Sequence, residues 1–356
     1  MPDRASALPR VRADVGRVLA EFLARQRGVL PGAADELRPG LDALEALLAG
    51  GKRLRPAFCY WGWRGTGAEP TPGLMAAAAA LELLHAGALV HDDVMDGSAT
   101  RRGRPALHEL FAGHHAERAW RGSPAAFGAG AAILLGDLLL SWTDELFAAS
   151  GLAPDALARG RPVLDLMRTE VMAGQYLDLV AQASGDDSLA SALRVVEYKT
   201  ARYTIERPLH LGAALAGPAD PGITAAYRGY GLPLGVAFQL RDDILGIFGD
   251  PARTGKPATD DLREGKRTVL LAITRARAGP RQAAVIDRCL GDPDLDEAAA
   301  AEVRAVITST GALAECERMI SRHLDQALAA LDAAPVTAGA RAALAELAIT
   351  ATARHD

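Results

Sequence analysis

The chain has 356 residues, of which 49% are hydrophobic, so it can bury a large core. Its formal net charge of −5 excludes the global positive field that is typical of nucleic-acid-binding proteins. Three widely spaced cysteines and a charged N-terminus without an apolar h-region lead us to expect a reduced, cytoplasmic protein with no signal peptide.

Helical segments are predicted along the whole chain. Alanine and leucine, which favour helix, dominate the composition, and no run of β-branched residues alternates with period two. The most apolar stretch, residues 74–90, contains Glu82 and His85, so we interpret it as a buried core helix and predict no membrane span. We expect one all-α domain, whose helices are separated by segments rich in glycine and proline at 62–73, 121–128, 184–188, 216–222 and 249–261.

The first polar motif in chain order is GGKRLRP at residues 50–56. It places Lys52, Arg53 and Arg55 at the start of a predicted helix, where backbone N–H groups and the helix dipole favour anions. Taken alone, such cations are more often simply exposed to solvent.

An acidic cluster ends the apolar helix that follows. Asp92 and Asp96 are four residues apart and therefore share a helix face, on which His85 also lies. Like charges at this spacing destabilise a helix, and the C-terminal end of the helix dipole adds to the effect. A hard divalent cation such as Mg²⁺ would compensate, completed by phosphate oxygens that Arg101 and Arg102 could bind.

A second acidic pair, Asp242 and Asp243, follows another apolar helix at residues 229–238. Further cations and hydroxyls accompany it at Lys199, Thr200, Lys256, Lys266 and Arg267. Two carboxylate clusters with dispersed Lys and Arg side chains indicate Mg²⁺-bridged diphosphates bound from several sides.

With these motifs the chain resembles the trans-isoprenyl diphosphate synthases, also called the polyprenyl synthetase family. Within that family it most resembles a bacterial geranylgeranyl diphosphate synthase. The resemblance covers about residues 15–350. A lone DDxxD motif would be weak evidence for the family, whereas eight blocks in the family's order are highly specific. The blocks are GGKRLRP, LELLHAGALVHDDVMD, RRGRPALH, GAAILLGDLLL, GQYLD, YKTARYTIERPLHLGAALAG, FQLRDDILGIFGD and TGKPATDDLREGKRT.

The resemblance implies an all-α, single-domain helical bundle around a central catalytic cavity, spanning residues 1–356 with a loose N-terminal extension at 1–14. It also implies a cytoplasmic homodimer that uses three Mg²⁺ ions per active site, which Mn²⁺ can replace. The substrates would be isopentenyl diphosphate and the allylic dimethylallyl, geranyl and farnesyl diphosphates.

Site residues are carried over motif by motif. Isopentenyl diphosphate would bind to Lys52, Arg55, His85 and Arg102. The allylic diphosphate would bind to Arg101, Lys199, Thr200, Gln239, Lys256 and Lys266. The metal ligands would be Asp92 and Asp96, with Asp242 on the opposite wall, and Gln175 and Asp178 would support this cluster. The catalytic set would be Asp92, Asp96, Lys199, Asp242 and Lys256.

Product length is predicted from the helix that carries the first motif. Family members that stop at fifteen carbons often have aromatic rings four and five residues before the motif, where this chain has Ala88 and Gly87. Leu84 and Leu81 lie roughly 12 and 16 Å below Asp92 at about 1.5 Å per residue. A floor at that depth favours geranylgeranyl diphosphate as product, with farnesyl diphosphate as the alternative.

One position departs from the family pattern, because Gly246 replaces the third aspartate of the second DDxxD motif. Asp250 could substitute if the helix ends before Gly249. If the loss is not tolerated, the chain would be an inactive regulatory partner subunit. A class I terpene cyclase is also all-α, but its (N/D)DxxSxxxE motif is missing near residues 239–260.

Overall fold

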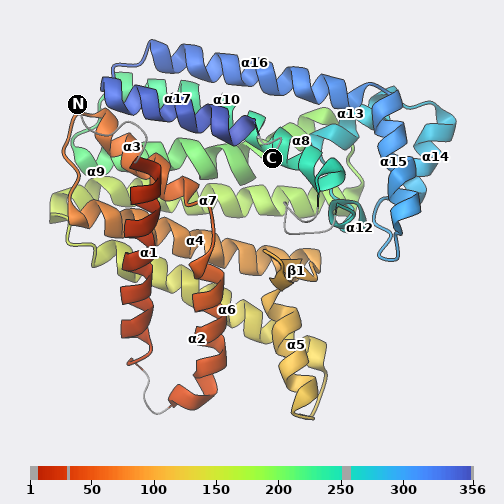
Figure 1. Cartoon of the computed structure of the whole chain (residues 1–356), viewed down its shortest axis with the longest axis horizontal. Helices are drawn as coiled ribbons and strands as arrows, with labels where there is room; N and C mark the ends of the chain where they lie inside the picture. The colour runs from red at the N-terminus through yellow and green to blue at the C-terminus, as the bar shows by residue number, and fades with distance from the viewer. Residues whose placement is uncertain (1–6, 30–32, 251–257, 354–356) are drawn as a thin grey trace. The chain divides into compact units, whose positions relative to one another are not determined.

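The computed structural model describes residues 7–29, 33–250 and 258–353, which are almost entirely helical (Figure 1). This confirms the all-α prediction. The chain divides into two compact units, each described by itself below. Unit 1 comprises Met1–Val163, Pro208–Ala219 and Val336–Ala340, and unit 2 comprises Leu164–Arg207, Asp220–Pro335 and Arg341–Asp356. The single-domain assignment stays a prediction.

Unit 1 is built around one long apolar helix, α4 (Pro72–Asp96), which packs against α1, α3 and α6. Thr71 caps its first turn by accepting a hydrogen bond from the Leu74 N–H, and Pro72 occupies the first turn, where its missing N–H costs nothing. The other elements are α1 (Ala7–Gln26), α2 (Ala34–Ala49), α3 (Leu54–Gly65), α5 (Leu107–Glu117), α6 (Pro124–Ala148), α9 (Arg207–Ala216) and the start of α7 (Pro154–Ser184).

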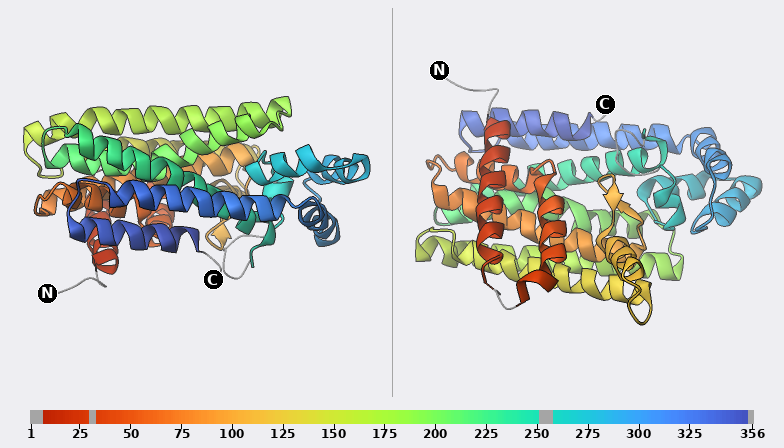
Figure 2. Two further views of the ribbon diagram at one scale, coloured as in Figure 1. Left: turned by 90° about the horizontal axis from the view of Figure 1, so that it is seen from above. Right: turned by 60° about the horizontal axis from the view of Figure 1, so that its bottom comes forward.

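The N-terminal helix corrects one expectation. Residues 1–14 were expected to form a loose extension; residues 1–6 lie outside the described residues, but residues 7–14 belong to α1, and Val11 is only 3% exposed. Val11, Val15, Leu19 and Phe22 recur at helical spacing and are buried, so burial of this apolar stripe orders the segment. Helices α1 and α2 lie side by side in Figure 1 and in the right-hand view of Figure 2.

Helix α6 differs from α4 in burial. Both are long and apolar enough to cross a membrane by length and composition alone, but the apolar window of α4 is 78% buried and that of α6 only 28%. Helix α4 is therefore the core helix that the sequence predicted. Helix α6 leaves Phe127, Ile133 and Leu134 exposed.

Unit 2 is organised around α10 (Pro221–Phe248), which packs against η2 and α16. A buried cluster that includes Leu240, Ile247 and Leu270 forms its core. Its other elements are most of α7, α8 (Leu189–Val195), the π-helical segment η2 (Val196–Glu206), α12 (Asp260–Arg263), α13 (Val269–Arg277), α14 (Pro280–Cys289), α15 (Glu297–Ser309), α16 (Ala312–Asp332) and most of α17 (Ala338–Thr352).

Candidate active site

The first acidic motif lies in the last turn of α4, as predicted. The helix ends at Gly97, whose left-handed backbone (φ 65°) lets its N–H donate to the Asp93 carbonyl. Asp92 and Asp96 are half-buried, whereas Asp93 is 3% exposed. Burial raises the pKa of Asp93, although the guanidinium of Arg101 lies against it and acts in the opposite direction.

A short β-hairpin carries the two arginines beside this motif. Strands β1 (Thr100–Arg101) and β2 (Arg104–Pro105) are joined by Arg102 and Gly103, with φ of 54° and 72°, the pattern of a type I′ turn. Arg101 Nε donates to Asp93 Oδ1 over 2.8 Å, and its Nη2 lies 4.0 Å from Asp92 Oδ2. Only helices were predicted from the sequence, so this hairpin was not foreseen.

Three of the residues predicted to bind isopentenyl diphosphate, Arg55, His85 and Arg102, lie close together in unit 1. Burial, followed by the positive charges of Arg55 and Arg102, lowers the pKa of His85 well below its ordinary value. Its imidazole is therefore neutral among arginines. Arg102 Nη1 donates to the carbonyls of Leu47 (2.8 Å) and Gly50 (3.1 Å), beside exposed Lys52.

Arg53 has a different role from its neighbours in the GGKRLRP motif. Its side chain is 5% exposed and its Nη1 donates to Glu82 Oε2 over 2.7 Å. Because breaking such a buried pair leaves an uncompensated charge, Arg53 is a structural residue.

In unit 2, hydrogen bonds connect three of the residues around the second motif. Thr200 Oγ1 donates to Gln239 Oε1 over 2.6 Å, and Gln239 Nε2 donates to Asp243 Oδ1 over 2.8 Å. Lys199 Nζ lies 2.7 Å from Asp178 Oδ2, and a supporting role for Asp178 stays a prediction. The chain of bonds fixes the orientation of the Gln239 amide.

Lys199 and Thr200 both lie in η2, whose wide turn the sequence did not predict. Buried Glu170 of α7 receives Arg202 Nη1 at 2.8 Å, Arg207 Nε at 2.6 Å and Arg207 Nη2 at 2.7 Å. Burial opposes ionisation of Glu170, but these hydrogen bonds outweigh it and lower the pKa. One carboxylate thus binds two arginines, one within η2 and one directly after it.

Close glycine contacts also hold η2 against its neighbours. A Cβ on Gly174 of α7 would lie 2.3 Å from the Lys199 backbone nitrogen. A Cβ on Gly235 of α10 would lie 2.3 Å from the Ala201 Cα. Neither position can carry a larger residue unless η2 moves, so α7 and α10 together fix the backbone that bears Lys199 and Thr200.

The second acidic pair lies near the end of α10. Asp242 is half-buried and Asp243 is 5% exposed. Burial, with smaller contributions from Asp261 and Asp242, raises the pKa of Asp243 to about 7. Lys266 Nζ lies 2.5 Å from Glu264 Oε2 and 3.5 Å from Asp261 Oδ1. Lys256, predicted to bind the allylic diphosphate, lies outside the described residues.

These side chains suit Mg²⁺ rather than a metal caged by protein alone. Within residues 7–29, 33–250 and 258–353, no group of three or more His, Cys, Asp and Glu residues could hold a metal ion. Mg²⁺ usually takes one or two carboxylates, keeps several waters and is completed by substrate phosphates. Asp92 and Asp96 in unit 1 and Asp242 in unit 2 offer that kind of oxygen ligand.

The residues predicted to set product length occupy different surroundings. Leu81 and Leu84 are buried, and Ala88 is half-buried. A Cβ on Gly87 would lie 3.1 Å from the Gly136 carbonyl and 3.2 Å from Leu140 Cδ2, both on α6. Gly87 therefore contributes to the contact between α4 and α6, and the pocket lining by Leu81, Leu84, Gly87 and Ala88 stays a prediction.

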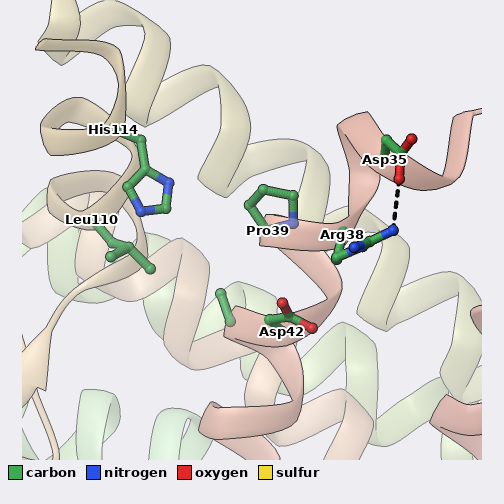
Figure 3. A pocket seen from close by; sticks show the side chains of 7 residues that line it. Asp35, Arg38, Pro39, Asp42, Leu110 and His114 are labelled. Carbon is green, nitrogen blue, oxygen red and sulfur yellow. Dashed lines mark hydrogen bonds and ion pairs between the residues drawn. The ribbon is translucent and has the colours of Figure 1, made fainter. Parts of the chain in front are cut away.

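A pocket of about 570 Å³ lies elsewhere in unit 1 (Figure 3). Residues of α2 and α5 line it, among them Arg38, Leu110 and His114. No residue predicted for substrate or metal contributes to it, so we do not assign the reaction to this pocket.

Comparison with known proteins places these features in a family context. Residues 41–307 match the family model described as polyprenyl synthetase. A geranylfarnesyl diphosphate synthase of Aeropyrum pernix is 33% identical over 82% of this chain and 86% of its own length. A (2E,6E)-farnesyl diphosphate synthase of Mycobacterium bovis is 33% identical over 77% of this chain and 73% of its own.

A solved structure extends the similarity over nearly the whole chain. It is the geranylgeranyl pyrophosphate synthase of Corynebacterium glutamicum, complexed with isoprenyl diphosphate and magnesium. It superposes with a TM-score of 0.94 at 40% sequence identity, covering 98% of this chain and 99% of that one.

Proposed function

Because the chain belongs to the polyprenyl synthetase family, we propose that it condenses isopentenyl diphosphate with allylic diphosphates to give geranylgeranyl diphosphate. The observation that carries the proposal is the end of α4. Asp92 and Asp96 share one face there, and the hairpin brings Arg101 and Arg102 to the same part of unit 1. Paired carboxylates beside arginines suit a metal-bridged diphosphate.

Magnesium is the metal we assign to these carboxylates, in line with the complex of the Corynebacterium protein. Asp92, Asp96 and Asp242 would hold it, with three ions per site and Mn²⁺ as a substitute. Bound Mg²⁺ would stabilise negative charge on the departing diphosphate. Around the allylic diphosphate, Lys199 and Lys266 would contribute positive charge and Thr200 a hydroxyl, and the contacts above fix the backbone of Lys199 and Thr200.

Isopentenyl diphosphate would bind through Lys52, Arg55 and Arg102, with His85 beside them. Since the imidazole of His85 is neutral, it can donate one hydrogen bond to a phosphate oxygen without repelling the two arginines. The arginines supply forked donors that match phosphate geometry. An apolar pocket would exclude water from the carbocation formed when the allylic C–O bond breaks.

The twenty-carbon product rests on side-chain size. Ala88 is small at the position where an aromatic ring would close the pocket, and Leu84 and Leu81 are bulkier residues farther along the helix. The relatives described above are named as farnesyl and geranylfarnesyl diphosphate synthases, so membership of the family alone does not fix product length. Farnesyl diphosphate is the alternative product.

The exposed apolar surface of α6 supports the homodimer, which we propose to be cytoplasmic. Phe127 and Leu134 are seven residues apart, so they share a helix face, and Leu134 is 70% exposed. A second copy would cover this face. Leu134→Glu should give monomers by light scattering at micromolar concentration, whereas Ile349→Glu, at an exposed position of α17, should not. Dimers of the Leu134 variant would exclude this face as the interface.

The activity is tested by supplying the purified protein with labelled isopentenyl diphosphate, Mg²⁺ and each allylic primer in turn. Elongated prenyl diphosphates are expected. Release of a hydrocarbon would instead identify a terpene cyclase, and no turnover with any primer would identify a partner subunit.

A further inference from the structure

Gly246, the glycine at the third position of the second motif, lies directly under a carboxylate from another element. A Cβ built on Gly246 of α10 would lie 1.8 Å from Asp261 Oδ2 and 2.8 Å from Asp261 Cγ. Side-chain carbons do not approach other atoms this closely, so even an alanine would displace Asp261. The carboxylate of Asp261 therefore fills the space into which a side chain at position 246 would extend.

Asp261 is buried, and hydrogen bonds hold the backbone around it in place. It is 6% exposed, and its backbone carbonyl accepts a hydrogen bond from the Lys266 N–H over 3.1 Å. The next residue, Leu262, is 1% exposed in the core of unit 2, and its carbonyl accepts from the Gly291 N–H over 2.8 Å. These bonds hold the backbone of α12 in place, so room for a side chain at position 246 would require the buried Asp261 carboxylate to rotate away from its present position beside Lys266.

A second observation comes from Asp243, one turn before Gly246. Its Oδ1 accepts from Gln239, but its Oδ2 is buried and has no hydrogen-bond partner in the part of the chain that the structure describes. A buried carboxylate oxygen without a donor is costly unless a ligand or ordered water completes it. This oxygen is therefore a candidate for contact with a ligand of the acidic cluster.

We propose that the carboxylate of Asp261 takes the place of the third aspartate of the second motif, and that Gly246 is the residue that admits it. Asp261 Oδ1 also lies 3.5 Å from Nζ of Lys266, the lysine assigned to the allylic diphosphate, whose nearer partner is Glu264 Oε2 at 2.5 Å. This inference rests on the proposed function. Asp250, the substitute considered from the sequence, is exposed and follows the end of α10.

The test restores the family motif and asks whether that harms the protein. Gly246→Asp recreates DDxxD but places a side chain on top of Asp261, so it should lower the melting temperature of the metal-free protein and raise the KM for the allylic diphosphate about tenfold. Gly246→Ala should act in the same direction. Gly229→Ala is the matched control on α10, because its Cβ would meet only Ala330 Cβ at 3.3 Å.

Moving the carboxylate back to the helix gives the decisive comparison. In Gly246→Asp/Asp261→Ala, the third carboxylate returns to α10 and the clash is removed. This double variant should melt higher and bind Mn²⁺ more tightly, as measured by electron paramagnetic resonance, than Gly246→Asp alone. The KM for isopentenyl diphosphate should stay unchanged throughout.

Wild-type melting temperature and allylic KM in Gly246→Asp would overturn the inference, as would a double variant no better than the single one. The melting and Mn²⁺ measurements need no turnover. If the wild-type protein elongates no primer, the proposed function fails, and these two readouts still decide the role of Asp261.

Discussion

Glu170 offers the sharpest test of how unit 2 positions its cations. The change Glu170→Gln keeps the shape of the side chain but removes the charge that Arg202 and Arg207 share. Three hydrogen bonds of 2.6–2.8 Å are affected, and the three side chains are only 8–15% exposed. Removing one partner of such a buried network typically costs about 3–5 kcal/mol, because the other charges stay buried.

The matched control is Glu197→Gln, which affects the other carboxylate that binds Arg202. Glu197 is 38% exposed, so solvent screens the pair and the loss should stay below about 1 kcal/mol. Urea unfolding followed by circular dichroism measures both variants. Under conditions where Glu170→Gln is still folded, its KM for the allylic diphosphate should also rise, because η2 carries Lys199 and Thr200. Equal stability losses in the two variants would refute the view that Glu170 holds η2 in place.

Three further predictions concern the α4 helix. Asp92→Ala and Asp96→Ala should each reduce turnover by orders of magnitude while the circular dichroism spectrum stays native, and near wild-type turnover in both would exclude them as metal ligands. Ala88→Phe should shorten the product to fifteen carbons and Leu84→Ala should lengthen it; an unchanged twenty-carbon product at a normal rate in Ala88→Phe would place the chain pocket elsewhere. The native pKa of His85 lies below its ordinary value of 6.5. As pH falls through 6.5, the imidazole therefore takes up a proton in the unfolded chain but not in the folded one, so the free energy of unfolding should decrease. Thermal melting from pH 7 to pH 5 should show a smaller decrease for His85→Gln, and parallel curves would contradict a neutral native imidazole.

Much of the fold could be predicted because its signals are local. The apolar run that becomes α4 predicts a buried helix, and the acidic cluster at its end was correctly placed in the last turn. The break at Gly249 was also expected, and α10 does end at Phe248. Such features depend on periodicity and on helix-terminating residues, which a single sequence shows directly.

The contacts that refine the site could not be predicted, because they join residues far apart in the sequence. No residue near Lys199 in the sequence indicates that Glu170 fixes the π-helical segment. Arg202 and Arg207 are visible in the sequence, but their shared partner lies more than thirty residues away. Residue type and spacing do not distinguish Arg53 from Arg55, and only the family resemblance assigned Arg55 to the diphosphate. In the structure Arg53 binds Glu82 inside unit 1, whereas Arg55 lies near His85. Asp261 stands in a conspicuous acidic pair, but only the structure shows that it covers Gly246.

The central claim is that this chain joins isopentenyl diphosphate to an allylic diphosphate and stops at twenty carbons. The most direct measurement is mass spectrometry of the products formed from farnesyl diphosphate, isopentenyl diphosphate and Mg²⁺, with released diphosphate quantified in the same reaction. We predict geranylgeranyl diphosphate and one equivalent of diphosphate for each molecule formed. Products longer than twenty carbons would contradict the predicted chain length, and absence of both geranylgeranyl diphosphate and released diphosphate with Mg²⁺ present would contradict the activity itself.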